Sequence, residues 1–240
     1  MAYFRCEWIS EALDMATSAV VILPETGDLA RTPVVYLLHG LSDNCTGWSR
    51  YTAVERYARN YGVAVVMPEV QRSFYCDTRS GMKYFTYISQ ELPKICRRFF
   101  GLSAEPQYNY VMGLSMGGFG ALKCALTNPQ WYAGCASFSG ALRPQASKVL
   151  SQAEADAIWG GGANAGPEND LFALVADCQN PPPIFQTCGE QDGLYSVNQA
   201  FAEHLEKLGV THVFTHGPGA HTWEFWDDSV RAAFDYFFGK

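Results

Sequence analysis

Short apolar runs rich in β-branched and aromatic residues recur along the chain and alternate with longer segments whose apolar residues follow a helical spacing. Runs of this length, bounded by glycine, proline or polar turns, predict strands, and the longer segments predict amphipathic helices. Eight strands are expected, at residues 4–9, 19–23, 33–38, 63–67, 108–113, 134–139, 183–188 and 211–215. Helices are expected at residues 48–60, 83–100, 118–127, 197–208 and 222–238.

Strands and helices alternate over nearly the whole chain, which is typical of an α/β fold with helices on both faces of a mostly parallel sheet. The first two strands are separated by a short polar turn, so an antiparallel start is expected. Pro93 lies inside the second helix and removes one backbone donor, which predicts a kink or a broken turn. No repeat or linker divides the sequence, and we expect one eight-stranded domain over residues 1–240.

Residues 142–182 interrupt this alternation and predict a small insertion. They contain a glycine-rich run at 160–166 and lead into a triple proline at 181–183. The glycine run follows no strand and has no Lys-Ser or Lys-Thr pair after it, so a phosphate-binding loop is not indicated. A mobile loop or a partial lid over the site is the expectation.

Composition and charge narrow the possible classes of protein. The chain has 240 residues, of which 48% are hydrophobic and 14% aromatic, enough for a substantial core. Its longest apolar runs are far shorter than the ~20 residues that cross a bilayer, so no membrane association is expected. The N-terminal residues are charged and lack the apolar segment of a secretory signal, which favours a cytoplasmic location.

The net charge of −7, without a basic stripe, argues against a nucleic-acid partner.

The eight cysteines show no C-x-x-C spacing. In a cytoplasmic protein of this size, such cysteines are more often small buried hydrophobic residues than disulfide partners or metal ligands. No metal site is therefore expected. Cys45 is singled out because its loop is placed near the candidate site described next.

A nucleophile elbow is predicted where the apolar strand at 108–113 runs into the pentapeptide G-L-S-M-G at 113–117 and then into a helix rich in Ala and Leu. In a G-x-S-x-G turn the glycines stand where a β-carbon would clash, and the serine hydroxyl is exposed above the carboxyl edge of the sheet. The pentapeptide alone is a weak signal, and the alternative is a tightly packed turn without chemistry. Ser115 therefore needs partners elsewhere in the chain.

His221 is the best candidate for the general base that an attacking serine requires. It lies in a glycine-rich loop between the last strand and the last helix, and loops at the carboxyl ends of strands converge over the elbow. His216 remains the alternative. His204 is expected on a helix surface, His212 at a strand start, and His39 in a loop discussed below.

Asp192 is the favoured carboxylate behind the base. It follows the strand at 183–188 in the loop G-E-Q-D-G, where a short side chain beside Gly193 can turn inward. Glu190 and Asp177 stay open as competitors. The order Ser, Asp, His along the chain is that of an α/β-hydrolase fold.

An oxyanion hole needs two backbone amides aimed at the developing charge. Met116, directly after the serine, would supply one amide. Leu41 would supply the other, because Gly40 permits the turn that points the Leu41 amide inward. His39 would then anchor this loop.

With these residues in hand, the chain resembles the esterase D-like branch of the α/β-hydrolase family, most closely the bacterial tributyrin esterases. The likeness covers nearly the whole length and rests on S-E-A-L-D-M at 10–15, Y-L-L-H-G-L-S at 36–42, V-E-R at 54–56, E-L-P at 91–93, G-L-S-M-G-G at 113–118, A-S-F-S-G-A at 136–141, C-G-E-Q-D at 188–192 and H-T-W-E-F-W at 221–226. The chain departs from the family in the Gly- and Ala-rich run at 160–166, where bulkier residues are more usual.

The resemblance implies a serine carboxylesterase that acts on short-chain acyl esters without a cofactor. It assigns the catalytic triad to Ser115, Asp192 and His221 and the oxyanion amides to Leu41 and Met116. Relatives include S-formylglutathione hydrolases, feruloyl and acetyl-sugar esterases and mycolyl-type acyltransferases, and some form homo-oligomers. The expected partner is a small-molecule ester. An acyltransferase, or a binding protein without catalysis on a hydrolase scaffold, remains an alternative.

Four aromatic residues near these loops are consistent either with a substrate pocket or with plain packing, and the sequence does not distinguish the two. They are Trp48, Tyr75, Trp159 and Trp223.

Overall fold

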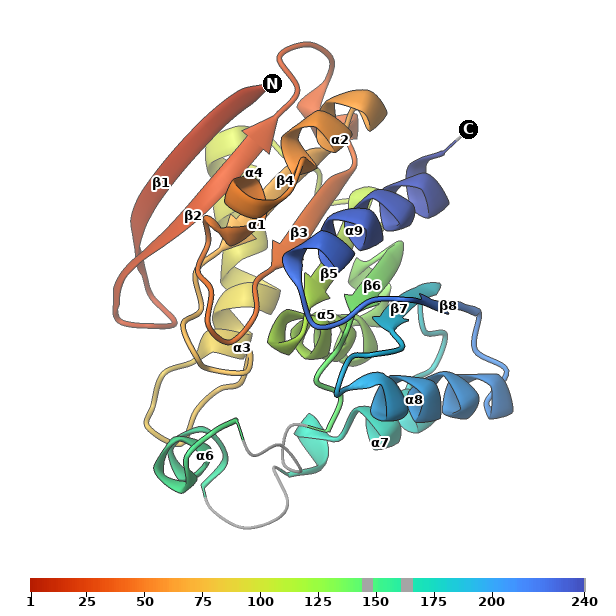
Figure 1. Cartoon of the computed structure of the whole chain (residues 1–240). Coiled ribbons are helices and arrows are strands. Elements are labelled where there is room, and N and C mark those ends of the chain that lie inside the picture. The colour runs from red at the N-terminus through yellow and green to blue at the C-terminus, as the bar shows by residue number, and fades with distance from the viewer. Residues whose placement is uncertain (144–148, 161–165, 240) are drawn as a thin grey trace.

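The computed structural model describes residues 1–143, 149–160 and 166–239. One sheet carries eight strands in the order β1-β2-β4-β3-β5-β6-β7-β8. β1 pairs with β2 and β2 with β4 in antiparallel fashion, and the other neighbours are parallel (Figure 1). The strands are β1 (Ala2–Ser10), β2 (Met15–Leu23), β3 (Val34–Leu38), β4 (Ala64–Pro68), β5 (Asn109–Leu114), β6 (Gly134–Phe138), β7 (Ile184–Gly189) and β8 (His212–Gly217).

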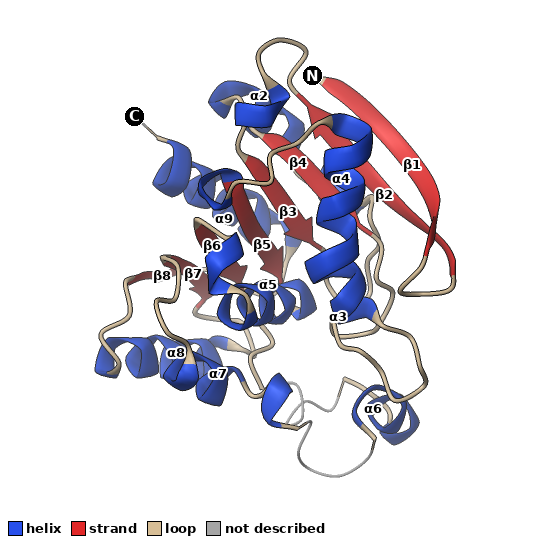
Figure 2. Ribbon diagram, turned by 180° about the vertical axis from the view of Figure 1, so that it is seen from behind, coloured by secondary structure: helices blue, strands red, loops and turns tan. Residues whose placement is uncertain are grey.

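Helices cover both faces of the sheet (Figures 1 and 2). One face carries α1 (Gly47–Tyr51), α2 (Val54–Tyr61) and α9 (Trp223–Phe238). The other carries α3 (Tyr84–Thr86), α4 (Leu92–Phe100), α5 (Met116–Thr127), α7 (Leu171–Asp177) and α8 (Tyr195–Lys207). α6 (Gln152–Trp159) lies beyond the carboxyl ends of the strands (Figure 2).

The two apolar layers follow from the alternation of side chains along each strand. Along β3, Val34, Tyr36 and Leu38 pack into the layer that includes α4 and α5, whereas Val35 and Leu37 pack against α2 and α9. All five residues are buried. A strand buried on both faces reads as a continuous apolar run, which explains why the central strands were predictable.

All eight expected strands are present, with ends displaced by a few residues, and the antiparallel start is confirmed. The single helix expected at 48–60 is instead two helices, α1 and α2. The break lies at Ala53, whose amide donates to Asp227 Oδ1 of α9 at 2.8 Å. The Ala53 amide thus bonds to a side chain 174 residues away in sequence instead of to a carbonyl of its own helix, and the local sequence does not reveal such a partner.

The disturbance expected at Pro93 takes the form of a π-helical turn at Tyr87–Glu91, just before α4. Pro93 itself lies in the first turn of α4, and helical conformation runs from α3 through α4. The wider turn accommodates the missing donor without ending the helix.

The insertion contains more regular structure than expected, because both α6 and α7 lie within residues 142–182. Ser151 and Glu154 form a capping box at the start of α6, and Asp170 caps α7 by accepting from the amides of Phe172 and Ala173. The mobile loop or partial lid expected at 160–166 falls mostly on residues 161–165, which lie outside the described residues.

Within the described part of the chain, no helix combines the length and the apolar character needed to cross a membrane.

The first turn of α5 packs so closely on β3 that a side chain at Gly117 has no space. A β-carbon there would overlap the carbonyl group of Leu38, which is backbone and cannot rotate away. We expect Gly117→Ala to lower the free energy of unfolding by about 3 kcal/mol, measured by urea denaturation. Gly217→Ala is the matched control, because a β-carbon at the end of β8 meets nothing within 4 Å. Equal stability of the two variants would contradict this account.

Candidate active site

Ser115 occupies a strained turn between β5 and α5. Its backbone has φ 53° and ψ −115°, a conformation that costs free energy for a residue with a side chain. Three backbone hydrogen bonds hold it: its amide donates to Phe138 O at 2.8 Å, and its carbonyl accepts from Phe119 at 3.2 Å and Ala141 at 3.0 Å. β5, β6 and α5 together therefore fix the hydroxyl at the carboxyl edge of the sheet.

The structure brings the three residues expected at this edge into hydrogen-bond contact. His221 Nε2 lies 3.0 Å from Ser115 Oγ, and His221 Nδ1 lies 2.8 Å from Asp192 Oδ2. A carboxylate only accepts, so Nδ1 carries the ring proton and Nε2 is left to accept from the hydroxyl. The loop before His221 reaches this point by crossing the end of β7, where Gly219 O accepts from the Gln191 amide at 2.9 Å.

Asp192 is buried, with 1% of its side chain exposed, whereas the side chain of His221 is 37% exposed. Burial raises the pKa of the Asp192 carboxyl, but hydrogen bonds from His221 and from the Leu194 amide outweigh it and hold the pKa below its usual range. Asp192 is therefore a carboxylate at neutral pH and sets the tautomer of His221.

The competing candidates lie elsewhere. His216 Nδ1 contacts Glu190 Oε1 at 2.9 Å, and both side chains are more than two-fifths exposed. His204 and His212 contact backbone carbonyls, and Asp177 is the exposed last residue of α7. The structure does not place any of these next to Ser115 Oγ.

The Gly40–Leu41 peptide faces the pocket in a fixed orientation. Gly40 O accepts from His39 Nδ1 at 2.7 Å and from the Asp43 amide at 3.2 Å. In a trans peptide the N–H points opposite to the C=O, so the Leu41 amide points away from His39. A β-carbon on Gly40 would lie 3.7 Å from Ser115 Cβ, which puts this peptide beside the serine. Met116 is the first residue of α5, and the first backbone amides of a helix have no acceptor within that helix.

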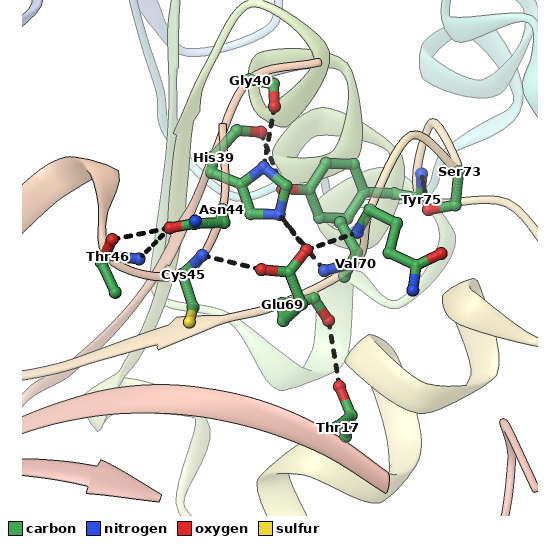
Figure 3. Close-up of polar contacts among 11 residues, drawn as sticks. Thr17, His39, Gly40, Asn44, Cys45, Thr46, Glu69, Val70, Ser73 and Tyr75 are labelled. Carbon is green, nitrogen blue, oxygen red and sulfur yellow. Dashed lines mark hydrogen bonds and ion pairs between the residues drawn. The ribbon is translucent and has the colours of Figure 1, made fainter. Parts of the chain in front are cut away.

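His39 anchors this loop through a polar network shown in Figure 3. It is 1% exposed, its Nε2 accepts from the Val70 amide at 3.2 Å, and Glu69 Oε1 lies 3.5 Å away. Nδ1 donates to Gly40 and Nε2 accepts from Val70, so the neutral ring satisfies both nitrogens. Tyr75 Oη donates to His39 O at 2.9 Å.

Glu69 ties the network to two further loops. It accepts from the amide of Cys45 at 3.0 Å and from that of Gln71 at 2.8 Å (Figure 3). Burial raises the pKa of Glu69, but its polar surroundings, which include the hydrogen bonds from the amides of Gln71 and Cys45, more than offset that effect and lower it. Glu69 thus stays ionised and braces the segment 40–45.

Sequence reasoning identified His39 as the loop anchor, missed Glu69, and left Tyr75 open between lining a substrate pocket and plain packing. Phe74 and Tyr75 both have positive φ, 50° and 52°, an unusual pair for bulky residues. This turn directs the Tyr75 ring under α5, where it fills the space left by Gly120. The only sequence signal was two aromatic residues in a loop, which does not distinguish positioning from packing.

Cys45 lies in the expected loop but lines a separate cavity with Arg5 and Glu7. Burial, and next the charge of Glu69, raise the pKa of its thiol to about 11. The thiol is therefore protonated at neutral pH and a poor nucleophile. Among the described residues, no three His, Cys, Asp or Glu side chains are grouped to hold a metal ion.

A pocket of about 980 Å³ opens over Ser115. Its walls combine the three hydrogen-bonded residues with apolar and aromatic side chains and with charges of both signs; they include Leu41, Asp43, Tyr51, Arg72, Phe74, Val149, Leu194, Trp223 and Trp226. Of the four aromatic residues considered from the sequence, Trp223 lines this pocket. Trp48, Tyr75 and Trp159 are buried in the surrounding packing.

Several known proteins resemble this chain over nearly its full length. A model of the esterase family matches residues 10–237. An acetyl esterase of Caldicellulosiruptor saccharolyticus is 26% identical over 98% of this chain and 98% of its own. The Staphylococcus aureus fluorophosphonate-binding serine hydrolase FphF aligns with a TM-score of 0.92 at 31% identity, over 100% of this chain and 99% of its own. The S-formylglutathione hydrolase FrmB of Staphylococcus aureus aligns with a TM-score of 0.88 at 33% identity, over 99% of this chain and 98% of its own.

We expect Glu69→Gln to destabilise the protein by about 1–3 kcal/mol at pH 7, because the new amide nitrogen would face a backbone N–H. The folded-state pKa of Glu69 is lowered, so its contribution is complete above the unfolded pKa of about 4.3 and is lost as pH falls through the folded value. Urea unfolding at pH 7 and pH 3 should show the difference from wild type shrinking at acid pH. Exposed Glu203→Gln on α8 is the control, and a pH-independent difference would contradict the assignment.

Proposed function

Since the chain belongs to the esterase family of α/β hydrolases and is a carboxylic ester hydrolase, we propose that it is a serine carboxylesterase acting on short-chain acyl esters through Ser115, His221 and Asp192. The observation that carries the proposal is the pair of hydrogen bonds joining Ser115 Oγ, the two nitrogens of His221 and Asp192 Oδ2, at 3.0 Å and 2.8 Å. These bonds lie at the mouth of a pocket large enough for an ester.

In the proposed reaction, His221 Nε2 takes the hydroxyl proton as Ser115 Oγ attacks the ester carbonyl carbon. The amides of Leu41 and Met116 donate to the negative oxygen that forms, and the N-terminal end of α5 adds a favourable dipole. His221 then protonates the departing alcohol, which leaves an acyl group on Ser115. Water, activated by the same imidazole, releases the acid and restores the hydroxyl.

The buried carboxylate of Asp192 holds the imidazole in the reactive tautomer and stabilises its protonated form between the two proton transfers. The neutral His39 ring has a different part, because both of its nitrogens are already engaged by backbone groups. It supports the Leu41 amide and exchanges no proton.

The substrate class is proposed on pocket chemistry and on relatives. Apolar residues such as Leu41, Phe74 and Leu194 line the pocket beside the serine, which suits a small acyl chain, and an acetyl esterase is among the proteins similar to this chain. Tributyrin and acetyl esters are therefore the leading substrates. Similarity to an S-formylglutathione hydrolase makes that thioester the second candidate.

Ser115→Ala is expected to reduce hydrolysis of nitrophenyl acetate by at least about 10⁴-fold, because no other group supplies the nucleophile. The fold should be unchanged, since alanine occupies the same volume, and thermal unfolding is the control. A fluorophosphonate probe should add one equivalent to wild type and none to the variant. Retained turnover by a purified variant would refute the assignment, and an unlabelled wild type would favour a binding protein.

Catalysis requires an unprotonated Nε2 on His221, and the hydrogen bond to Asp192 selects the tautomer that provides it. The variant Asp192→Asn should lose about 10³- to 10⁴-fold in kcat, because an amide does not hold the required tautomer.

Steady-state kinetics with tributyrin, acetylated xylose, methyl ferulate and S-formylglutathione would rank the substrates. Adding acceptor alcohols to the same assays would reveal an acyltransferase through new ester products.

A further inference from the structure

A second cavity of about 360 Å³ lies away from the active site, between α4 and the amino ends of β5 and β6. Figure 2 shows α4 lying over this face of the sheet. None of the described residues that line the cavity lines the pocket over Ser115. The reaction proposed above therefore does not use it.

Tyr36 lines this cavity, and its buried hydroxyl has no hydrogen-bond partner among the described residues. Tyr36 is 2% exposed, and burial raises the pKa of its hydroxyl well above the ordinary range. The group is thus a protonated donor without an acceptor. Buried donors are nearly always paired, and an unpaired one beside a cavity indicates an acceptor supplied from outside the chain.

The exposed part of the cavity lining is cationic. Lys94 and Arg97 are three residues apart on α4 and therefore project from the same side of the helix. Arg97 Nε donates to Pro93 O at 3.0 Å, which orients the guanidinium and leaves its terminal nitrogens to other partners. None of the described lining residues is acidic, although the chain carries a net charge of −7.

The remaining lining is aromatic and polar, and hydrogen bonds hold part of it in place. Trp131 is 40% exposed and, with buried Tyr132, supplies an aromatic surface. Asn109 Nδ2 donates to the carbonyls of Ser103 and Glu105, at 3.3 Å and 2.8 Å, which braces the loop before β5. The π-helical turn at Tyr87–Glu91 contributes to the same wall, and such turns are frequent at functional sites.

We propose that this cavity binds a small hydroxylated aromatic carboxylate. The carboxylate pairs with Lys94 and Arg97 at the rim, the ring lies along Trp131, and the ring hydroxyl oxygen accepts from Tyr36 at the buried end. A guanidinium matches a carboxylate in geometry and charge, and an aromatic ring can pack against the indole of Trp131. The proposal does not rest on the role of Ser115.

The test is calorimetric titration of the full chain with 4-hydroxybenzoate, with benzoate and 4-hydroxybenzamide as partial ligands. Wild type should bind 4-hydroxybenzoate most tightly. Arg97→Ala should weaken that binding about tenfold, as expected for loss of a charge-assisted hydrogen bond. Arg98→Ala is the matched control, because Arg98 is the next residue on α4 and does not line the cavity.

Tyr36→Phe provides the specific readout. This substitution should weaken the binding of 4-hydroxybenzoate about five- to tenfold and leave the affinity for benzoate unchanged. The preference for 4-hydroxybenzoate over benzoate should therefore disappear. Thermal unfolding should not fall, because the hydroxyl has no partner to lose. If Tyr36→Phe does not fold, the comparison of Arg97→Ala with Arg98→Ala still tests whether the ligand binds in this cavity. Both arginine side chains are exposed, so neither substitution should disturb folding.

No saturable binding at millimolar ligand, or binding that neither Tyr36→Phe nor Arg97→Ala alters, would overturn the proposal. Binding that is lost when Ser115 is blocked by the fluorophosphonate probe would place the ligand in the active-site pocket and would also overturn it.

Discussion

The close approach of three backbone segments is the constraint on which the rest of the site depends. α5 begins so near to β3 and β5 that glycine is required at Gly113 and Gly117, where a β-carbon would overlap backbone atoms. This packing forces the reversal at Ser115 into its strained conformation and points the hydroxyl outward. It also brings the loop after β3 beside the serine, because Leu38 lies opposite Gly113 in the sheet. The outward-pointing hydroxyl of Ser115 and the position of the loop after β3 are thus consequences of one contact.

Polar groups at the carboxyl edge form two separate networks with different tasks. One runs through Ser115, His221 and Asp192 and opens onto the pocket. The other joins His39 and Glu69 to the backbone of three loops and is largely closed to solvent. The first exchanges protons in the proposed reaction, and its imidazole is partially exposed. The second must hold a peptide still, and satisfied buried hydrogen bonds provide that rigidity.

Strand positions and the juxtaposition of Ser115, Asp192 and His221 were predictable because they follow from local signals: apolar runs, a glycine-flanked serine, and loops at the ends of parallel strands. The break at Ala53 was not predictable, since it is caused by Asp227 from the last helix. Glu69 was missed, and Tyr75 was left open between pocket lining and packing, because their roles come from the backbone groups they meet after folding. α6 and α7 were hidden by a segment rich in Ala, Gly and Pro, in which capping by Ser151 and Asp170 gave the only local indication.

The ion pair between Arg72 and Glu154 connects the rim of the pocket to α6, with Arg72 Nε 2.7 Å from Glu154 Oε1. Hydrogen bonds from Arg72 and Ser151 lower the pKa of Glu154 to about 2, so acidity within the physiological range does not discharge this contact. Both side chains are substantially exposed, and dissolved ions screen such pairs effectively. The contribution of this pair to holding α6 beside the pocket therefore depends on the salt concentration more than on pH, whereas the backbone hydrogen bonds from Arg79 and Ser80 to Ile158 and Ala157 are much less sensitive to salt.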